Sequence, residues 1–289
     1  MFFRWDWLRP VLTAPVVPTL GPVHPQAFTV DLFEAARTAA HSDRHFLPYD
    51  KDRRWSCEKE EAVLPDDIVH RPDHTLIPTL SRRGRGTVKV YAYGHRPDTV
   101  ARAGDVAAEL AAMHGAAVAR MIRPFGPETR PVRGTRIQLQ DFSLRPCPAP
   151  EGPVRPLEAW PAAVQETFGA FAATVATDGF AFLWERMQAG HCGPVLTTAL
   201  GSRIVGAIGP MEIRPDPLGV PQLMPQYFAV LPEARGHGLG RVLWRAAMHW
   251  GQTHGAAYQL LQTEIGGASD RLCQSEGLTS LGFTRTDHV

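Results

Sequence analysis

The chain has 289 residues, and 44% of them are hydrophobic, which is enough for one large core or for two cores of ordinary size. Its formal net charge of +1 gives no electrostatic reason to expect a nucleic-acid-binding or membrane-surface protein. Charges and prolines interrupt residues 1–20, so we expect neither a signal peptide nor a membrane span. Four cysteines lie far apart without a C-x-x-C pair, which favours reduced thiols in a cytoplasmic protein over a zinc site or a disulfide framework: Cys57, Cys147, Cys192 and Cys273.

The first half of the sequence predicts an α/β portion. Residues 1–30 are irregular and rich in proline, and a short amphipathic helix is expected from Asp31. The segment 87–93, TVKVYAY, alternates like a half-buried strand, and a helix over 98–115 and a strand in AAVARMI follow it. Residues 46–78 show no strong periodicity.

Two features of this half resemble functional motifs but are not expected to be sites. The basic stretch RRGRG at 82–86 precedes a strand instead of a helix, so its amides lack a helix dipole and we expect a hairpin turn. His41 and His45 have helical spacing, but Ser42 stands where a zinc-protease motif needs glutamate. We interpret them as surface histidines and predict no metal site.

A proline- and glycine-rich stretch at 123–134 marks the expected boundary between domains 1–132 and 133–289. The second half predicts the order strand, two helices, three strands, helix, strand, helix, strand. Its clearest elements are strands at 135–144, 226–230 and 257–263, helices at 158–176 and 180–189, a hairpin turning at Gly201-Ser202, and a helix that Gly255 ends.

The most informative stretch is EARGHGLGRVLW at 233–244, where three glycines alternate before a helical pattern. A triphosphatase loop would need lysine and then serine or threonine after Gly240, but Arg241 and Val242 stand there. A dinucleotide fingerprint has different glycine spacing, and a methyltransferase fold needs more chain than remains after Gly240. The alternative that survives is an anion site, in which successive N–H groups converge at a helix N-terminus.

The segment Arg235-Gly236-His237-Gly238-Leu239-Gly240 matches an R-x-x-G-x-G pattern, and a hydrophobic strand ending AVLPE precedes it. It resembles the pyrophosphate-binding turn of the GNAT superfamily of N-acetyltransferases. The downstream LGF at 281–283 is similar to the closing motif before that family's last strands. The resemblance covers roughly residues 135–289.

The resemblance implies an α/β fold with a mixed, mostly antiparallel twisted sheet flanked by helices. The N-terminal α/β portion is additional, and a degenerate second GNAT-like copy is one interpretation of it. The ligand implied is acetyl-CoA or another acyl-CoA, without a metal. Carried over to this sequence, the cofactor-binding positions are the backbone of Phe228, Ala229 and Val230, and the turn of Arg235, Gly236, His237, Gly238, Leu239, Gly240 and Arg241.

The proton-transfer groups are less defined than the cofactor turn. Glu264, after the strand 257–263, is the preferred general base, and Tyr227 and His237 are alternative titratable groups. Many family members have a tyrosine four residues before the glycine of LGF, where this chain has Leu278. Ser275 and Cys273 are the nearby polar substitutes. Pro225, within or just before the strand, either marks the bulge that separates strands or begins a short strand.

The family resemblance implies transfer of an acyl group to an amine of a small molecule or a protein. The basic stripe Arg241, Arg245 and His249 leaves open a phosphopantetheine donor on an acyl carrier protein, as well as contact with the ribose phosphate of coenzyme A. A non-catalytic acyl-CoA-binding or interaction module is the third alternative, because the tyrosine is missing. Neither nucleic acid nor membrane is expected as a partner.

Overall fold

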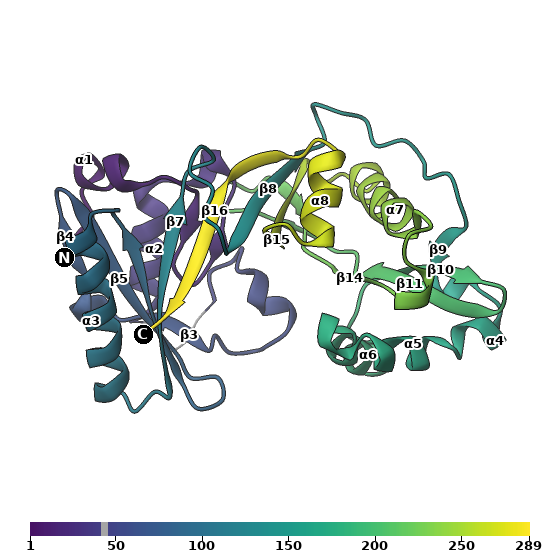
Figure 1. Cartoon of the computed structure of the whole chain (residues 1–289), viewed down its shortest axis with the longest axis horizontal. Helices are drawn as coiled ribbons and strands as arrows, with labels where there is room; N and C mark the ends of the chain where they lie inside the picture. Colours follow the sequence, from purple (N-terminus) through teal and green to yellow (C-terminus); the bar gives the residue numbers. More distant parts are fainter. Residues whose placement is uncertain (42–45) are drawn as a thin grey trace. The chain divides into compact units, whose positions relative to one another are not determined.

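A computed structural model describes residues 1–41 and 46–289 of the chain (Figure 1), so His45 lies outside the described residues. The chain forms two compact units. The first comprises residues 1–139, 216–219 and 260–289, and the second comprises 140–215 and 220–259. Strands β8 (Thr135–Asp141) and β15 (Tyr258–Glu264) are each divided between the units. The sequence-based division into domains 1–132 and 133–289 stays a prediction.

The first unit is built on a mixed sheet whose strand order is β15-β8-β16-β7-β6-β5-β3, with β4 also paired to β5. Its strands β6 and β7 are parallel and are connected by helix α3, whereas β5 and β6 form an antiparallel hairpin. Besides β8 and β15, its elements are α1 (Trp5–Leu8), β1 (Val16–Val17), β2 (Gly21–Pro22), α2 (Val30–Ala39), β3 (Glu61–Val63), β4 (Val69–Arg71), β5 (His74–Ser81), β6 (Thr87–Tyr93), α3 (Pro97–Met113), β7 (Val118–Phe125), α8 (Ala268–Ser275) and β16 (Thr279–His288).

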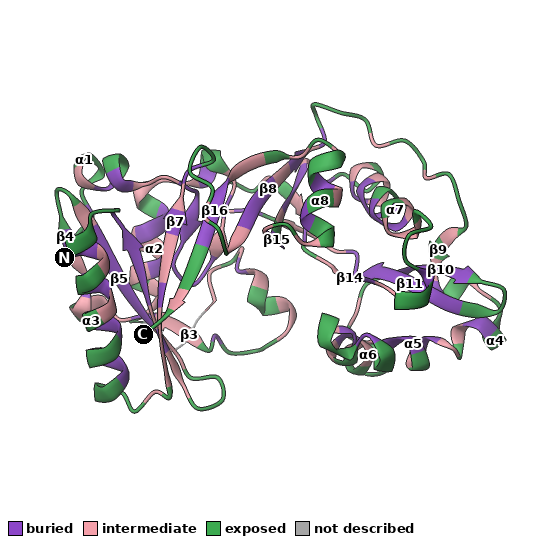
Figure 2. Cartoon of the chain, viewed as in Figure 1, coloured by how far each residue is buried: buried purple, intermediate pink, exposed green. Residues whose placement is uncertain are grey.

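Strand β6 shows why this sheet has a core on each face. Val88, Val90 and Ala92 pack with the apolar side of α3. The alternate residues Tyr91 and Tyr93 belong to the other core, which α2 and the N-terminal segment complete. Side chains of a strand alternate between faces, so the pattern TVKVYAY supplies both cores. Figure 2 shows the buried residues concentrated along the strands of this sheet.

The sequence expectations for this unit are largely confirmed, because its long elements have clear periodicity. The strand predicted at 87–93 coincides with β6, and the pairing Ser81↔Thr87 confirms a hairpin turn at RRGRG. Strands β3, β4 and β5 within 61–81 were not predicted. Two of them are only three residues long, and β5 contains Pro78, which weakens a strand signal.

The second unit contains a four-stranded antiparallel sheet in the order β14-β11-β10-β9. Helices α4, α5 and α6 cover one face of it, and α7 covers the other (Figure 1). Its elements are β9 (Val154–Pro156), α4 (Ala162–Gln165), α5 (Phe168–Thr174), α6 (Phe180–Gln188), β10 (Leu196–Leu200), β11 (Arg203–Gly209), β12 (Ile213–Pro215), β13 (Pro221–Leu223), β14 (Tyr227–Val230) and α7 (Leu239–Thr253).

An aromatic cluster fills the space between the sheet of the second unit and its small helices. Phe168, Phe171 and Phe180 are almost completely buried, and their rings contact one another with centroids 5.1–6.4 Å apart. The predicted hairpin is confirmed, because β10 and β11 pair around Gly201-Ser202. The helix predicted at 158–176 is divided into the short elements α4 and α5.

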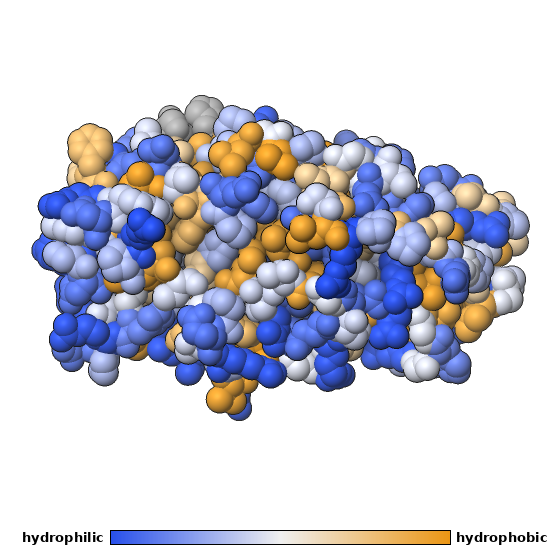
Figure 3. All heavy atoms as spheres, turned by 90° about the horizontal axis from the view of Figure 1, so that it is seen from above, coloured by the Kyte–Doolittle hydropathy of each residue, from blue (hydrophilic) through white to orange (hydrophobic). Residues whose placement is uncertain are grey.

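The surface of the molecule is mixed in character. Figure 3 shows hydrophilic side chains interspersed with smaller apolar groups over the face that it presents. Across the described residues, no helix combines the length and apolarity that a membrane crossing requires.

Candidate functional site

Residues 221–230 form two short strands that belong to different sheets. The first, β13, pairs in parallel with β15 through Gln222↔Tyr258 and Leu223↔Gln259. The second, β14, pairs with β11 instead. Pro225 lies between them and has no N–H to continue a ladder. Of the two interpretations of this proline, the structure supports a separation point.

A glutamine pair lies at this separation point, and sequence reasoning missed it. Gln259 of β15 is fully buried, and its Nε2 donates to Oε1 of Gln226 at 2.7 Å and to the Met224 carbonyl at 3.5 Å. Gln226 in turn donates to the same carbonyl. The available signal was Gln259 inside the largely apolar predicted strand 257–263, because glutamine is seldom buried without a specific partner.

The glycine turn follows β14 through a short 3₁₀ segment, Pro232–Ala234, and leads directly into α7. Gly236 and Gly238 have φ of +82° and +77°, in the left-handed region that favours glycine. A side chain added at either position would meet open space. The backbone conformation is therefore the reason for these two glycines.

Gly240 has a different role from the other two glycines. Its φ is not positive, and a Cβ there would lie 3.4 Å from the ring of Phe228. The small residue thus lets the first turn of α7 lie close to β14.

The N-terminus of α7 has the features of an anion site. The first i→i−4 bond of the helix runs from the Val242 N–H to the Gly238 carbonyl, at 3.2 Å. The N–H groups of Leu239 and Gly240 precede this bond and belong to the first turn, where no carbonyl of the helix lies four residues earlier to accept them. The turn is exposed, and the dipole of a 15-residue helix favours negative charge there.

The basic residues around the turn are held in different ways. Arg235 is exposed, and its Nε donates to the Val230 carbonyl at 2.9 Å, which ties the turn to the end of β14. Arg241 and Arg245 are exposed on α7. His249, expected with them in one basic stripe, instead bonds through Nδ1 to the Cys147 carbonyl at 2.7 Å. The loop after β8 therefore contacts this position of the helix, and the role expected for the stripe stays a prediction.

Tyr227 has the surroundings of a packing residue. Its ring packs against Phe180 and Phe182, with centroids 6.4 and 6.3 Å away. A Cβ on Gly179 would lie only 2.3 Å from the Tyr227 ring, so that glycine makes room for it.

The two other catalytic candidates belong to the first unit. Glu264 is exposed at the end of β15, and its carbonyl accepts from the Gly267 N–H at 2.9 Å. Ser275 is the last residue of α8, and its hydroxyl donates to the Leu272 carbonyl at 2.7 Å. Glu264 is accessible to an amine, whereas the Ser275 proton is already bonded within the helix.

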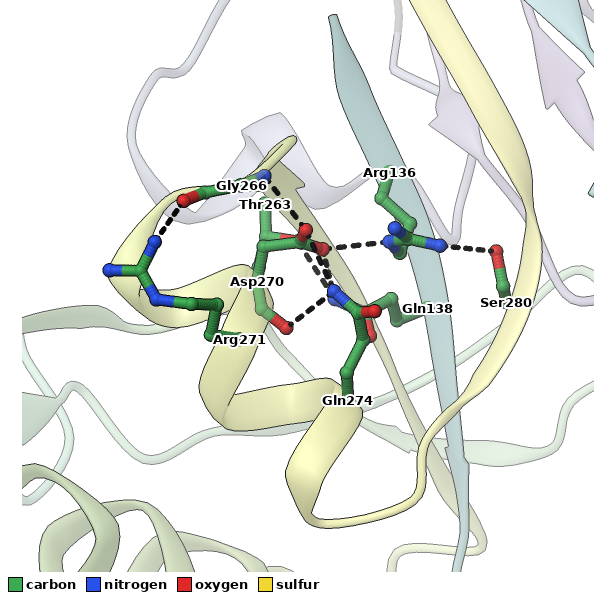
Figure 4. Close-up of polar contacts among 8 residues, drawn as sticks. All are labelled: Arg136, Gln138, Thr263, Gly266, Asp270, Arg271, Gln274 and Ser280. Atoms are coloured by element: carbon green, nitrogen blue, oxygen red, sulfur yellow. Dashed lines mark hydrogen bonds and ion pairs between the residues drawn. The ribbon is translucent and has the colours of Figure 1, made fainter. Parts of the chain in front are cut away.

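A buried carboxylate network in the first unit holds the segment that follows Glu264 (Figure 4), and the sequence analysis missed it. Asp270 accepts from Arg136 Nε at 2.7 Å, from Thr263 Oγ1 at 3.2 Å and from the Gly266 N–H at 2.9 Å. Gln274 donates to the same carboxylate at 2.9 Å. Burial by itself raises the pKa of Asp270, but the Gly266 N–H and Arg136 outweigh it and leave that pKa below its usual value.

Residues 159–271 match the family model described as acetyltransferase (GNAT) family. The similarity to GNAT acetyltransferases therefore lies in the C-terminal half of the chain. A GCN5-related N-acetyltransferase from Sphaerobacter thermophilus has a similar fold, with a TM-score of 0.51 at 16% identity over 89% of this chain and 90% of that one.

Two further solved structures are similar at TM-scores too low to support an argument. A GNAT-family acetyltransferase from Colwellia psychrerythraea has a TM-score of 0.45 at 10% identity, covering 89% of this chain and 95% of that one. A tandem GNAT protein from the clavulanic acid biosynthesis pathway has a TM-score of 0.44 at 14% identity, covering 88% and 93%. No curated protein sequence matches this chain significantly.

The GNAT fold class expected from the sequence is confirmed, and one detail of the motif assignment is corrected. The LGF at 281–283 does not precede the last strand but lies inside β16. Helix α8 ends at Ser275, and Gly277, with φ of +79°, follows it. Counting four residues back from that glycine leads to Cys273 instead of Leu278. Burial raises the pKa of the Cys273 thiol to about 12, so it stays protonated at neutral pH.

The match of residues 159–271 to the GNAT acetyltransferase family implies an acyl-CoA donor, and the residues of the glycine turn fit such a donor. Open space at Gly236 and Gly238 lets a phosphate approach the amides closely. Within the described part of the chain, no group of three or more His, Cys, Asp or Glu side chains is arranged to hold a metal ion.

Proposed function

We propose that the protein transfers an acetyl or other acyl group from an acyl-CoA to an amine of a small molecule or a protein. The observation that carries this proposal is the combination of a separated strand, β14, with an open glycine turn and a helix N-terminus directly after it. An anion site alone would accept many phosphates. The adjacent strand adds a place for an extended arm.

Strand β14 is suited to that arm because it is the last strand of its sheet. Its backbone pairs with β11 on one side, so an extended ligand can add to the other edge by backbone hydrogen bonds. Under this proposal Phe228, Ala229 and Val230 bind the pantetheine arm. The amides and side chains from Arg235 to Arg241 bind the diphosphate.

The bound thioester supplies an activated acyl group, and the chain must position the amine and accept its proton. An amine with a pKa near 8–10 loses its proton at a cost of roughly 1.4–4 kcal/mol at neutral pH. We assign proton acceptance to Glu264, which is exposed at the end of β15. Tyr227 and Ser275 stay alternative titratable or donor groups.

Calorimetry with acetyl-CoA tests the proposal. The wild-type protein is expected to bind, and Gly238→Asp is expected to weaken binding about a hundredfold or more, because it adds negative charge at the anion site. Gly201→Asp is a matched control. Gly201 has φ of +59° and open space around it, but it lies at the hairpin between β10 and β11.

The outcomes separate clearly. No binding by the wild-type protein, or equal binding by Gly238→Asp, would contradict the proposal.

If the wild-type protein binds acetyl-CoA, the release of free thiol in the presence of a panel of amines would identify the acceptor class. Competition between acetyl-CoA and an acylated carrier protein would show which donor the basic residues Arg241 and Arg245 favour.

A further inference from the structure

A pocket lies in the second unit between the end of β9, the start of β10 and the helices α4 and α6. Its volume is about 390 Å³, within the roughly 300–1,000 Å³ of small-molecule sites. Its walls are mainly apolar, with one carboxylate and one amide among the residues that line it: Leu157, Met187, Pro194, Val195, Glu158 and Gln165. None of these residues belongs to the glycine turn or to β14.

Hydrogen bonds hold the walls of this pocket in place. Gln165 Nε2 donates to the Glu158 carbonyl at 3.2 Å and to the Trp160 carbonyl at 2.7 Å, which fixes the segment after β9. The Leu157 N–H donates to the Val195 carbonyl at 2.9 Å and joins this segment to the start of β10. These contacts form the pocket without any ligand, as is usual for small-molecule sites.

The strand register places the pocket in one row with Tyr227 of β14. A Cβ on Gly209 would lie 3.0 Å from Val195 Cα, and Gly209 pairs with Tyr227. Two strand spacings therefore separate the pocket edge at β10 from β14, or about 10 Å at roughly 4.8 Å each. Helix α6 covers the same interval, because Phe182 packs against Tyr227 and Met187, further along the helix, lines the pocket.

The carboxylate of Glu158 decides which charge the pocket accepts. Glu158 is exposed, and its backbone carbonyl, not its carboxylate, takes the bond from Gln165. Of the described residues that line the pocket, none is a lysine, arginine or histidine. An ammonium group can bind this carboxylate while its methylene stem lies on the apolar walls, as lysine side chains do on protein surfaces.

We propose that this pocket anchors the far end of the acceptor, and that the acceptor is a linear aliphatic diamine or polyamine. The inference rests on the proposed function, in which the donor arm begins at the glycine turn and runs back along β14 toward Tyr227. The reacting amine then lies near Tyr227 and a second ammonium lies beside Glu158, about 10 Å away by strand spacing. A methylene chain between the two nitrogens supplies this length and matches the apolar walls.

Acyl transfer to two amines of equal chain length tests this inference. With acetyl-CoA as donor, the full chain should use octamethylenediamine with a lower KM than octylamine, because octylamine lacks the second ammonium. Glu158→Gln should reduce this ratio of KM values about fivefold, which is the size of a favourable exposed ion pair. Release of free thiol measures both reactions.

Glu166→Gln is the matched control, because Glu166 is an exposed glutamate directly after Gln165 and does not line the pocket. It should keep the wild-type ratio. An equal fall of the ratio in both variants would show a general effect of negative charge and overturn the contact with Glu158. Met187→Trp fills part of the pocket and should raise the KM for octamethylenediamine in a protein whose circular dichroism shows the native fold.

Failure of the inference differs from failure of the proposed function. If the wild-type protein binds acetyl-CoA by calorimetry but acylates no linear diamine, or if Glu158→Gln keeps the wild-type ratio, the acceptor assignment is wrong. The acyl-CoA donor site then stands. If the wild-type protein binds no acetyl-CoA, both proposals are overturned.

Discussion

Each of the two units contains a strand that leads into a long helix. The two regions differ in whether the backbone pairing of that strand with its neighbour is continuous or interrupted. In the first, β6 and β7 flank α3 and pair in parallel without a break from Thr87↔Val118 to Tyr91↔Ile122. In the second, the strand before α7 is divided at Pro225, and only its first part pairs with β15. Of these two strand–helix connections, the one that we identify as a candidate ligand site is the one with the interrupted ladder.

The turns that lead into the two helices also differ, in the space around their glycines. The turn into α3 has a single glycine, Gly94, and a Cβ there would lie 2.9 Å from His74. Next to it, His95 stacks on Phe125 with centroids 5.2 Å apart. The turn into α7 is exposed and has open space at both left-handed glycines. We therefore propose that the first region, if it is a second GNAT-like copy, does not bind CoA in the same way.

The largest expected effect concerns the anchoring of β15, the partner of the interrupted strand. Asp270→Asn should lower the free energy of unfolding by about 3–5 kcal/mol, because it leaves buried Arg136 without a charged partner. Urea unfolding measures this. The control is Asp287→Asn, which breaks the more exposed ion pairs with Arg123 and Arg285 and should cost less than Asp270→Asn, by about 1 kcal/mol for each pair at most.

The same carboxylate predicts a pH dependence. The pKa of Asp270 is lower in the folded protein than in the unfolded chain, so its stabilisation is present above the unfolded value and is lost as the pH falls through the folded value. The difference in stability between the wild-type protein and Asp270→Asn should be constant near neutral pH and shrink below about pH 4. A difference independent of pH down to complete protonation would contradict this assignment.

An intermediate effect tests why glycine is present in the two turns. Gly94→Ala combines a positive φ of +133° with a steric clash and should destabilise the protein by about 2–3 kcal/mol. Gly236→Ala meets open space and should cost only about 1 kcal/mol, from backbone strain alone. If urea unfolding shows that both variants lose the same free energy of unfolding, steric clash does not distinguish the two turns. Acetyl-CoA binding should be unaffected by Gly94→Ala.

The smallest expected effect concerns His70 of the first unit, and the glycine turn of the second unit should not take part in it. His70 is buried, its Nε2 accepts the Arg4 N–H at 2.9 Å, and burial lowers its pKa. Its folded pKa lies below the unfolded value, so this stabilisation is present above about pH 6.5 and is lost as the pH falls. Hydrogen exchange of residues 1–8 should therefore accelerate between pH 7.5 and pH 5 relative to the variant His70→Gln.

Local sequence patterns were sufficient to predict the long helices and strands. The alternation in TVKVYAY predicted β6, and the spacing of apolar residues after Gly238 predicted α7, because both patterns reflect contacts within one turn or one strand. Trp244, Ala247 and Met248 are among the buried residues of α7. A single-sequence pattern does not reveal how many neighbours cover a helix.

By itself, therefore, the sequence determined the fold class, the glycine turn and the helix behind it, since these depend on neighbouring residues. Only the tertiary structure decided that β8 lies between β15 and β16, that Gln259 meets Gln226, and that Arg136 meets Asp270. The last pair is 134 residues apart in the chain. Contacts over such separations depend on which strands pair and in which register, and no local periodicity specifies that choice.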